Sequence, residues 1–327
     1  MKPEPTLLAT HNWPRLTAAF RHRSSMVLQM HISKTGGTTM RVELPKLIGR
    51  KWCGCKFAPY LCACANGDHN LSALAEAARK KRCNLISLEC PRSMINWVFP
   101  DGRAWPEHGG VTIVMVRNPI NHWLSVVKHA SKRVNSSDQA IIDMSAMSFV
   151  HVSQNWSTSF WNLSHGMHDP RNMQTRWLGP RVDRAVRFLA EDSTLVLVHE
   201  FYDASICMMA VAVNTWRAIR DKCHCNGQFT SASNVVPAIN AAARHKSLAG
   251  KRTRGYLESL DPADMTAMTG WLSQDFLLYA AALNIFHADV AAAERSVGQR
   301  FLCAGGEDIA SVPWRRWDAR PSQFEIQ

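Results

Sequence analysis

The sequence MVLQMHISKTGGTT at residues 26–39 joins a short apolar run, a glycine-rich turn and the start of a helix. The apolar run at 26–32 is bounded by polar residues and predicts a buried strand. Two glycines let the backbone approach a ligand closely, and the N–H groups at a helix start attract an anion. A lysine and two threonines add a positive charge and hydroxyl donors. These residues are Lys34, Gly36, Gly37, Thr38 and Thr39. The segment predicts a phosphate-binding turn, with an ordinary strand–helix turn as the alternative.

The order of residues in this turn differs from that of the ATPase phosphate loop. In GxxxxGK[ST] the lysine follows the last glycine and precedes a Ser or Thr that binds Mg²⁺. Here Lys34 precedes both glycines. Glu200, just beyond the apolar run at 194–198, resembles the acidic residue that ends a metal-binding strand in ATPases. A nucleotide kinase or ATPase therefore stays open as an alternative.

Further apolar runs at 84–89, 111–116 and 194–198 predict more buried strands, because they are short and nearly continuous. Segments with helical periodicity alternate with them. These segments are 38–48, 71–81, 119–133, 182–190, 203–216 and 273–297. The alternation predicts an α/β fold with a central, mainly parallel sheet flanked by helices. We expect a P-loop-like three-layer arrangement.

The chain predicts one main domain. We expect a basic N-terminal lead-in at 1–24, a single domain at 25–300 and a C-terminal tail at 301–327. A cysteine-rich insertion at 50–68 interrupts the domain. The longest apolar runs are shorter than a membrane-spanning helix requires, so we expect membrane association only through an anchor that this sequence does not contain.

Charge and cysteine content indicate which kind of partner and which cellular compartment to expect. The 327 residues carry a net charge of +12, and the segments 5–42, 108–137 and 222–257 contain no Asp or Glu. Such a surface suits an anionic partner, although a solvated basic face is equally consistent. The ten cysteines include CxC pairs at 53–55, 62–64 and 223–225. Disulfides in an oxidising compartment are favoured over a zinc site, and four N-glycosylation sequons agree with that choice.

A second anion site is expected after the apolar run at 111–116. Arg117-Asn-Pro119 follows it directly, at the strand end where open parallel sheets bind ligands. An arginine is a permanently charged planar fork suited to phosphate. Ser125 lies two turns into the next helix and is expected to face the same ligand. An arginine in this place, where a metal site would have an aspartate, suits phosphate binding without a metal.

These two elements together resemble the PAPS-dependent carbohydrate sulfotransferases, in particular the Golgi heparan sulfate 6-O/2-O type. HISKTGGTT resembles their 5′-phosphosulfate loop, and TIVMVRNPINHWLSVVKH resembles their 3′-phosphate element. Three further segments follow in the family's order: NMQTRWL at 172–178, LVLVHEFYDAS at 195–205 and QDFLLYAA at 274–281. The chain departs from the family at Asn118, where an Asp is usual, and at Asn121-His122, where an Arg is common.

The resemblance implies transfer of a sulfuryl group from PAPS to a hydroxyl of a carbohydrate acceptor, with no metal and no nucleic-acid partner. It implies that the 5′ end of PAPS is held by Lys34, Thr35, Gly36, Gly37, Thr38 and Thr39, and the 3′-phosphate by Arg117 and Ser125. Lys34 would also stabilise charge on the leaving phosphate. Residues expected to line the acceptor cleft, with packing as the alternative, are Gln174, Arg176 and Trp177.

The resemblance implies a general base, His or Glu, after the second strand, and Glu89 is the first candidate here. Burial would have to raise the pKa of Glu89 for it to act near neutral pH. A structural pairing of Glu89 with an arginine is the alternative, and three histidines remain as other bases: His108, His122 and His129. His31 is expected to be positioned by its strand. The resemblance implies the Golgi lumen, and a non-catalytic module that binds anionic glycans remains a further alternative.

Overall fold

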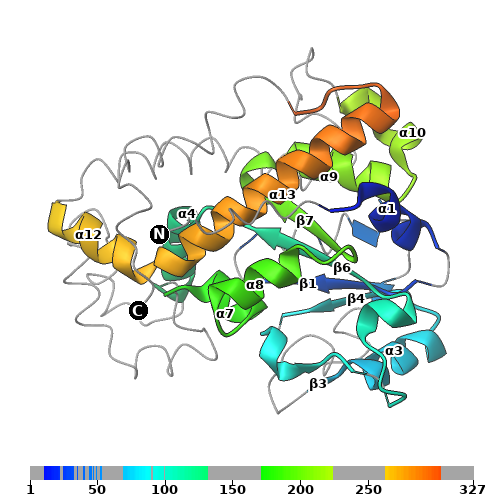
Figure 1. The fold of residues 1–327 in the computed structure, drawn as a ribbon, viewed down its shortest axis with the longest axis horizontal. Helices are drawn as coiled ribbons and strands as arrows, with labels where there is room; N and C mark the ends of the chain where they lie inside the picture. Colours follow the sequence, from blue (N-terminus) through cyan, green and yellow to red (C-terminus); the bar gives the residue numbers. More distant parts are fainter. Residues whose placement is uncertain are drawn as a thin grey trace, which may run out of the picture.

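The computed structural model describes residues 11–22, 25–32, 35, 40, 44–45, 47, 49, 52–53, 69–89, 91–98, 100–131, 171–223 and 262–302. Within them the chain forms an α/β fold around a parallel sheet of five strands in the order β2-β4-β1-β6-β7. The strands are β1 (Val27–Met30), β2 (Trp52–Cys53), β4 (Leu85–Leu88), β6 (Val111–Val116) and β7 (Thr194–Val198). Figure 1 shows β4, β1, β6 and β7 side by side. A smaller parallel pair joins β3 (His69–Asn70) to β5 (Ile95–Asn96).

Every residue of β1, β4, β6 and β7 is buried, including polar ones such as Gln29 and Thr112. Strands buried on both faces read as continuous apolar runs, which is why the sequence predicts them. The predicted strand at 111–116 is confirmed as β6 with both bounds unchanged. The strand predicted at 194–198 is likewise confirmed as β7 with both bounds unchanged, and those at 26–32 and 84–89 are confirmed as β1 and β4 within two residues at each end.

The helices of the described residues lie around the sheet, except that α12 extends away from it (Figure 1). They are α1 (Trp13–Arg21), α3 (Leu71–Lys80), α4 (Pro119–Ser131), α7 (Met173–Leu178), α8 (Val182–Leu189), α9 (Tyr202–Ala212), α10 (Trp216–Ile219), α12 (Pro262–Trp271) and α13 (Ser273–Val297). Short 3-10 turns lie at Arg92–Met94, Trp105–His108, His199–Phe201 and Arg220–Lys222. In the order of the chain, α8, α9 and α13 pack against β7, and α3 packs against β4.

The helices predicted at 71–81, 119–133, 182–190 and 273–297 are confirmed as α3, α4, α8 and α13. The helix predicted at 203–216 ends earlier, at Ala212, because Asn214 takes a left-handed backbone conformation with φ of 63°. The helix predicted at 38–48 lies mostly outside the described residues.

Helix α1 was not expected, because 1–24 reads as a basic lead-in. The Asn12 side chain accepts a hydrogen bond from the Arg15 N–H and so caps the helix. Trp13, Leu16 and Phe20 are buried in the main core. Just before the helix, His11 Nδ1 lies 2.7 Å from Asp289 Oδ2 of α13. This part of the N-terminal segment is therefore integral to the core.

Helix α13 is long and apolar enough, by length and composition, to cross a membrane. Half of its most apolar window is buried inside the fold, and it carries the buried residues Asp275 and Asp289. Both carboxyl groups bond to other parts of the chain. In this structure α13 is a core helix that supports β7.

Candidate functional site at the carboxyl ends of the strands

The strand order has a topological switch point between β1 and β6, and we refer to the region outside the carboxyl ends of these two strands as the crevice. The chain leaves β1 toward β2 on one side of the sheet and leaves β6 toward β7 on the other. In open parallel sheets, ligands bind at such a divergence, outside the carboxyl ends of the strands. Thr35 after β1 and Arg117 after β6 lie at this edge of the sheet. In register, Met30 pairs with Val114, so β6 extends two residues further than β1.

Arg117 lies beside a buried carboxylate, that of Glu200. Glu200 Oε1 accepts hydrogen bonds from the Asn118 N–H at 3.0 Å and from Asn121 Nδ2 at 3.4 Å. Glu200 Oε2 accepts one from the Tyr279 hydroxyl at 3.1 Å. Burial raises the pKa of Glu200, while the charge of Arg117 opposes the rise. Burial lowers the pKa of Arg117, but a guanidinium stays charged in proteins.

Asn118 follows Arg117 directly, and its side chain caps α4. Its Oδ1 accepts hydrogen bonds from the N–H groups of Ile120 at 3.1 Å and Asn121 at 3.3 Å. Asn118 is only 2% exposed. An asparagine therefore performs at this helix start what an aspartate would do.

The side chain of Gln174 forms two hydrogen bonds with the main chain of Arg117. Its Oε1 accepts from the Arg117 N–H at 2.8 Å, and its Nε2 donates to the Arg117 carbonyl at 2.8 Å. Gln174 is 1% exposed. It sits in the first turn of α7, where Asp275 of α13 accepts the N–H groups of Gln174 at 3.2 Å and Thr175 at 2.7 Å. Burial raises the pKa of Asp275 to about 6, although these hydrogen bonds oppose the rise.

Asn172 completes a reciprocal cap between α7 and α13. Its Oδ1 accepts the N–H groups of Gln274 at 3.0 Å and Asp275 at 3.1 Å, in the first turn of α13. Asp275 does the same for α7, so each helix start is held by a side chain from the other. Asn172 adopts a left-handed backbone conformation with φ of 47°, which asparagine tolerates better than most residues.

Glu89 follows β4 and contacts the end of β1. Its Oε2 lies 3.4 Å from His31 Nδ1, and the side chain of Glu89 is 33% exposed against 7% for His31. The His31 N–H donates to the Leu88 carbonyl at 2.8 Å, so the backbone fixes the relation of the two strand ends. The first candidate base is therefore paired with a histidine at the edge of the crevice.

The phosphate turn is described only in part. Thr35 is 1% exposed, and both its N–H and its hydroxyl donate to the Ile32 carbonyl, at 3.2 and 2.8 Å. The chain therefore turns tightly directly after β1. The other residues expected to bind the 5′ end lie outside the described residues: Lys34, Gly36, Gly37, Thr38 and Thr39.

The remaining site candidates are spread over several elements. Ser125 is half-buried, two turns into α4. Trp177 is 3% exposed and belongs to the main core, whereas Arg176 on the same helix is exposed. His122 is buried in the first turns of α4. His129 also lies in α4, but its side chain is outside the described residues.

His108 lies at the end of the sheet opposite the candidate site. It precedes β6 and its Nε2 lies 3.0 Å from Asp101 Oδ1. Strands of a parallel sheet all run the same way, so His108 lies at the amino end of the sheet. The crevice, in contrast, is at the carboxyl end.

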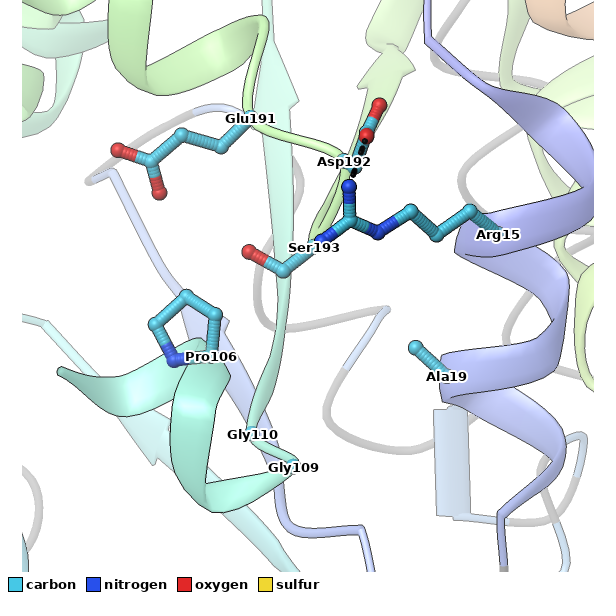
Figure 2. Close-up of a pocket in the computed structure, with 8 residues that line it drawn as sticks. All are labelled: Arg15, Ala19, Pro106, Gly109, Gly110, Glu191, Asp192 and Ser193. Atoms are coloured by element: carbon cyan, nitrogen blue, oxygen red, sulfur yellow. Dashed lines mark hydrogen bonds and ion pairs between the residues drawn. The ribbon is translucent and has the colours of Figure 1, made fainter. Parts of the chain in front are cut away.

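A pocket of about 330 Å³ also lies at the amino end (Figure 2). Residues of the turns that precede β6 and β7 line it together with α1. They are Arg15, Ala19, Pro106, Gly109, Gly110, Glu191, Asp192 and Ser193. Figure 2 shows Arg15 reaching across to Asp192, with Nη1 and Oδ2 separated by 3.2 Å. This hollow is on the side of the sheet away from the candidate site.

Cysteine and metal chemistry can be assessed in part. Cys207 of α9 forms a disulfide with Cys223, which lies just after the 3-10 turn at Arg220–Lys222. Cys83 is disulfide-bonded too. Among the described residues no group of three or more His, Cys, Asp or Glu side chains could hold a metal ion. The CxC pairs at 53–55 and 62–64 fall almost wholly outside those residues, so the choice between disulfide and zinc there stays a prediction.

Several residues that shape the site were not expected from the sequence: Asn172, Asp275 and Tyr279. Their segments enter the sequence analysis only through their resemblance to sulfotransferase segments. A polar residue within an otherwise apolar helix face, such as Asp275 in α13, is the signal that marks a buried bonding partner. No family model matches the chain, and neither the curated proteins nor the solved structures contain a match.

Proposed function

We propose that the protein transfers a sulfuryl group from PAPS to a hydroxyl of a carbohydrate acceptor, as a sulfotransferase with a P-loop-like fold. The observation that carries the proposal is the arrangement at the β1–β6 crevice. Thr35 after β1 and Arg117 after β6 lie beyond the carboxyl ends of the two strands at the switch point, and Glu89 lies at the end of β4, the strand beside β1. PAPS carries phosphate at both ends, so it needs two separate anion-binding elements.

The strand order supports the P-loop-like part of this proposal. Numbered along the chain within the main sheet, the strands follow the order 2-3-1-4-5. The first strand is then central, and a ligand-binding loop after it would lie at the switch point. In this arrangement Lys34 and the residues that follow it would hold the 5′-phosphosulfate, while Arg117 and Ser125 would hold the 3′-phosphate.

The chemistry divides between two groups. Glu89 would accept the proton of the acceptor hydroxyl as that oxygen attacks sulfur, and Lys34 would stabilise the negative charge on the departing phosphate. The bond that forms joins the acceptor oxygen to sulfur, and the bond that breaks joins sulfur to the phosphate oxygen of PAPS. Adenosine 3′,5′-bisphosphate (PAP) leaves. The reaction needs no metal ion.

The bonding of Glu200 disfavours the kinase or ATPase alternative. That alternative needs Glu200 as a ligand of Mg²⁺ or of its water. Its two carboxylate oxygens instead accept hydrogen bonds from Asn118, Asn121 and Tyr279, and the charge of Arg117 lies nearby. A carboxylate used in this way supports the neighbouring arginine.

The disulfide between Cys207 and Cys223 supports a secretory location, because disulfides persist mainly in oxidising compartments. We include the Golgi lumen in the proposal for this reason. The basic segments suit an anionic acceptor such as a glycosaminoglycan.

The test is calorimetric titration with PAP, run beside ATP with Mg²⁺, followed by an assay of sulfuryl transfer from labelled PAPS to O-desulfated heparan sulfate. We expect PAP to bind and the Arg117→Ala and Lys34→Ala variants to lose at least about tenfold in affinity. Metal-dependent ATP binding without PAP binding would support the kinase or ATPase instead. Glycan binding with neither nucleotide would support a non-catalytic module.

A further inference from the structure

Gln174 replaces a strand neighbour for Arg117. Registered pairing between β6 and β7 ends at Val116 with Val198, and pairing between β6 and β1 ends earlier, at Val114. One residue beyond, the carboxamide of Gln174 makes the two bonds that a neighbouring strand makes at a paired residue, both at 2.8 Å. The main chain of Arg117 is therefore fixed although the sheet has ended there.

Gln174 is itself held from α13. Its N–H donates to Asp275 Oδ2 at 3.2 Å, and the neighbouring N–H of Thr175 donates to Oδ1 at 2.7 Å. Gln174 and Asp275 are 1% and 0% exposed. A side chain that is buried and anchored in this way has few alternative rotamers, so the peptide groups that it holds cannot rotate freely.

An arginine selects phosphate by the geometry of its planar fork as much as by charge. The direction in which the side chain leaves the backbone decides whether that fork meets the ligand. Here the backbone direction is set by Gln174, while the charge of Glu200 lies beside the guanidinium. With 1% exposure, Gln174 has almost no surface left to offer a sugar acceptor.

We propose that Gln174 is a positioning residue for the 3′-phosphate of the nucleotide: by holding the main chain of Arg117 it fixes the guanidinium in its phosphate-binding direction. This inference rests on the proposed function. It assigns Gln174 to nucleotide selection through Arg117, rather than to contact with the acceptor.

The experiment compares two probes that differ only in the 3′-phosphate, PAP and adenosine 5′-monophosphate (AMP). Their dissociation constants are measured by calorimetry for the wild-type protein and for Gln174→Met, which keeps the side-chain size but loses both bonds to Arg117. We expect wild-type protein to prefer PAP by at least about tenfold. We expect Gln174→Met to lose most of that preference while its affinity for AMP stays within about twofold.

A double variant and a surface variant serve as controls. In an Arg117→Ala background, Gln174→Met should add less than about a twofold loss of PAP affinity, because both changes act through one contact. Arg181→Ala, an exposed change at the start of α8, should leave both affinities unchanged. Should Gln174→Met fail to fold, Gln174→Glu keeps the acceptor for the Arg117 N–H and loses the donor to its carbonyl. We expect it to reduce the PAP preference in the same sense.

The outcomes separate the two proposals. A wild-type protein without preference for PAP over AMP would contradict the sulfotransferase function itself. A preference that survives in both Gln174 variants would overturn only the positioning role of Gln174. Equal losses for PAP and AMP would also overturn it, since they would indicate a general structural effect.

Discussion

Arg117 and Glu89 stand at the carboxyl ends of strands two places apart in one sheet, yet the chain holds them differently. Gln174 hydrogen-bonds both the N–H and the carbonyl of Arg117, and the N–H of Asn118 donates to Glu200. Glu89 is one-third exposed and lies 3.4 Å from His31. The difference suits two tasks, since a binding group gains from being fixed before the ligand arrives, whereas a base must reach the acceptor. Nucleotide affinity and turnover should therefore respond to different substitutions.

The largest expected effect is on turnover. Glu89→Gln keeps the size of the side chain but cannot accept the proton of the acceptor hydroxyl. We expect sulfuryl transfer from PAPS to fall by about 10²- to 10⁴-fold, the usual contribution of a general base. The affinity for PAP should stay within about twofold. Initial rates and calorimetric titration of the same preparation measure the two quantities.

Glu76→Gln is the matched control, because Glu76 is a surface glutamate on α3 that is 65% exposed. It should leave both turnover and affinity unchanged. If Glu89→Gln retained wild-type turnover, Glu89 would not be the base. The structural difference between Arg117 and Glu89 would then not reflect a division between binding and catalysis.

The second effect is on stability against pH, through Asp275. Burial raises the pKa of Asp275 to about 6 from an ordinary value of 3.8, so the folded protein binds this proton more tightly than the unfolded chain does. The contribution to stability is therefore present at low pH and is lost as pH rises through about 6. Between pH 4.5 and 7 we expect the unfolding free energy to fall by about 2 kcal/mol from this group alone.

Urea unfolding of the wild-type protein and of Asp275→Asn at the two pH values measures this difference. The variant cannot titrate at this position, so its decline between pH 4.5 and 7 should be smaller by about 2 kcal/mol. Identical declines would show that Asp275 titrates normally. The carboxyl group that anchors Gln174 would then not have the raised pKa that its burial indicates.

Physical regularity decides which features the sequence predicts. The strand at 111–116 is a nearly continuous apolar run, and burial on both faces of a parallel sheet produces that pattern directly. The placement of Glu89 and Arg117 at the same edge of the sheet also follows, because parallel strands end at the same edge. Helix α1 was missed although Trp13, Leu16 and Phe20 follow helical spacing behind the cap Asn12. That signal was present in the sequence and was outweighed by the basic charge around it.

The hydrogen bonds that hold the main chain of Arg117 could not be predicted in this way. Gln174 is 57 residues from Arg117 in the chain, and Asp275 is 101 residues from Gln174. Such pairs depend on how α7 and α13 pack, and no local pattern encodes that packing. Sequence reasoning can mark a buried polar residue as needing a partner, but the identity of the partner comes only from the fold.

The smallest expected effect concerns the hydrogen bond that Tyr279 donates to Glu200. The Tyr279 hydroxyl donates to Glu200 Oε2 at 3.1 Å, whereas the buried Tyr202 hydroxyl lies 3.8 Å from the sulfur of Met40. Removing a donor to a buried carboxyl leaves that group short of a bond, while a thioether is a weak acceptor. We expect Tyr279→Phe to lower the unfolding free energy by about 1 kcal/mol and Tyr202→Phe by less than about 0.5 kcal/mol. Urea unfolding of the two variants measures the difference.

Because Glu200 lies beside Arg117, Tyr279→Phe should also weaken PAP binding slightly more than Tyr202→Phe does. Equal effects of the two changes on both quantities would mean that Glu200 does not depend on Tyr279, and the rigid half of the comparison would then rest on Gln174 alone.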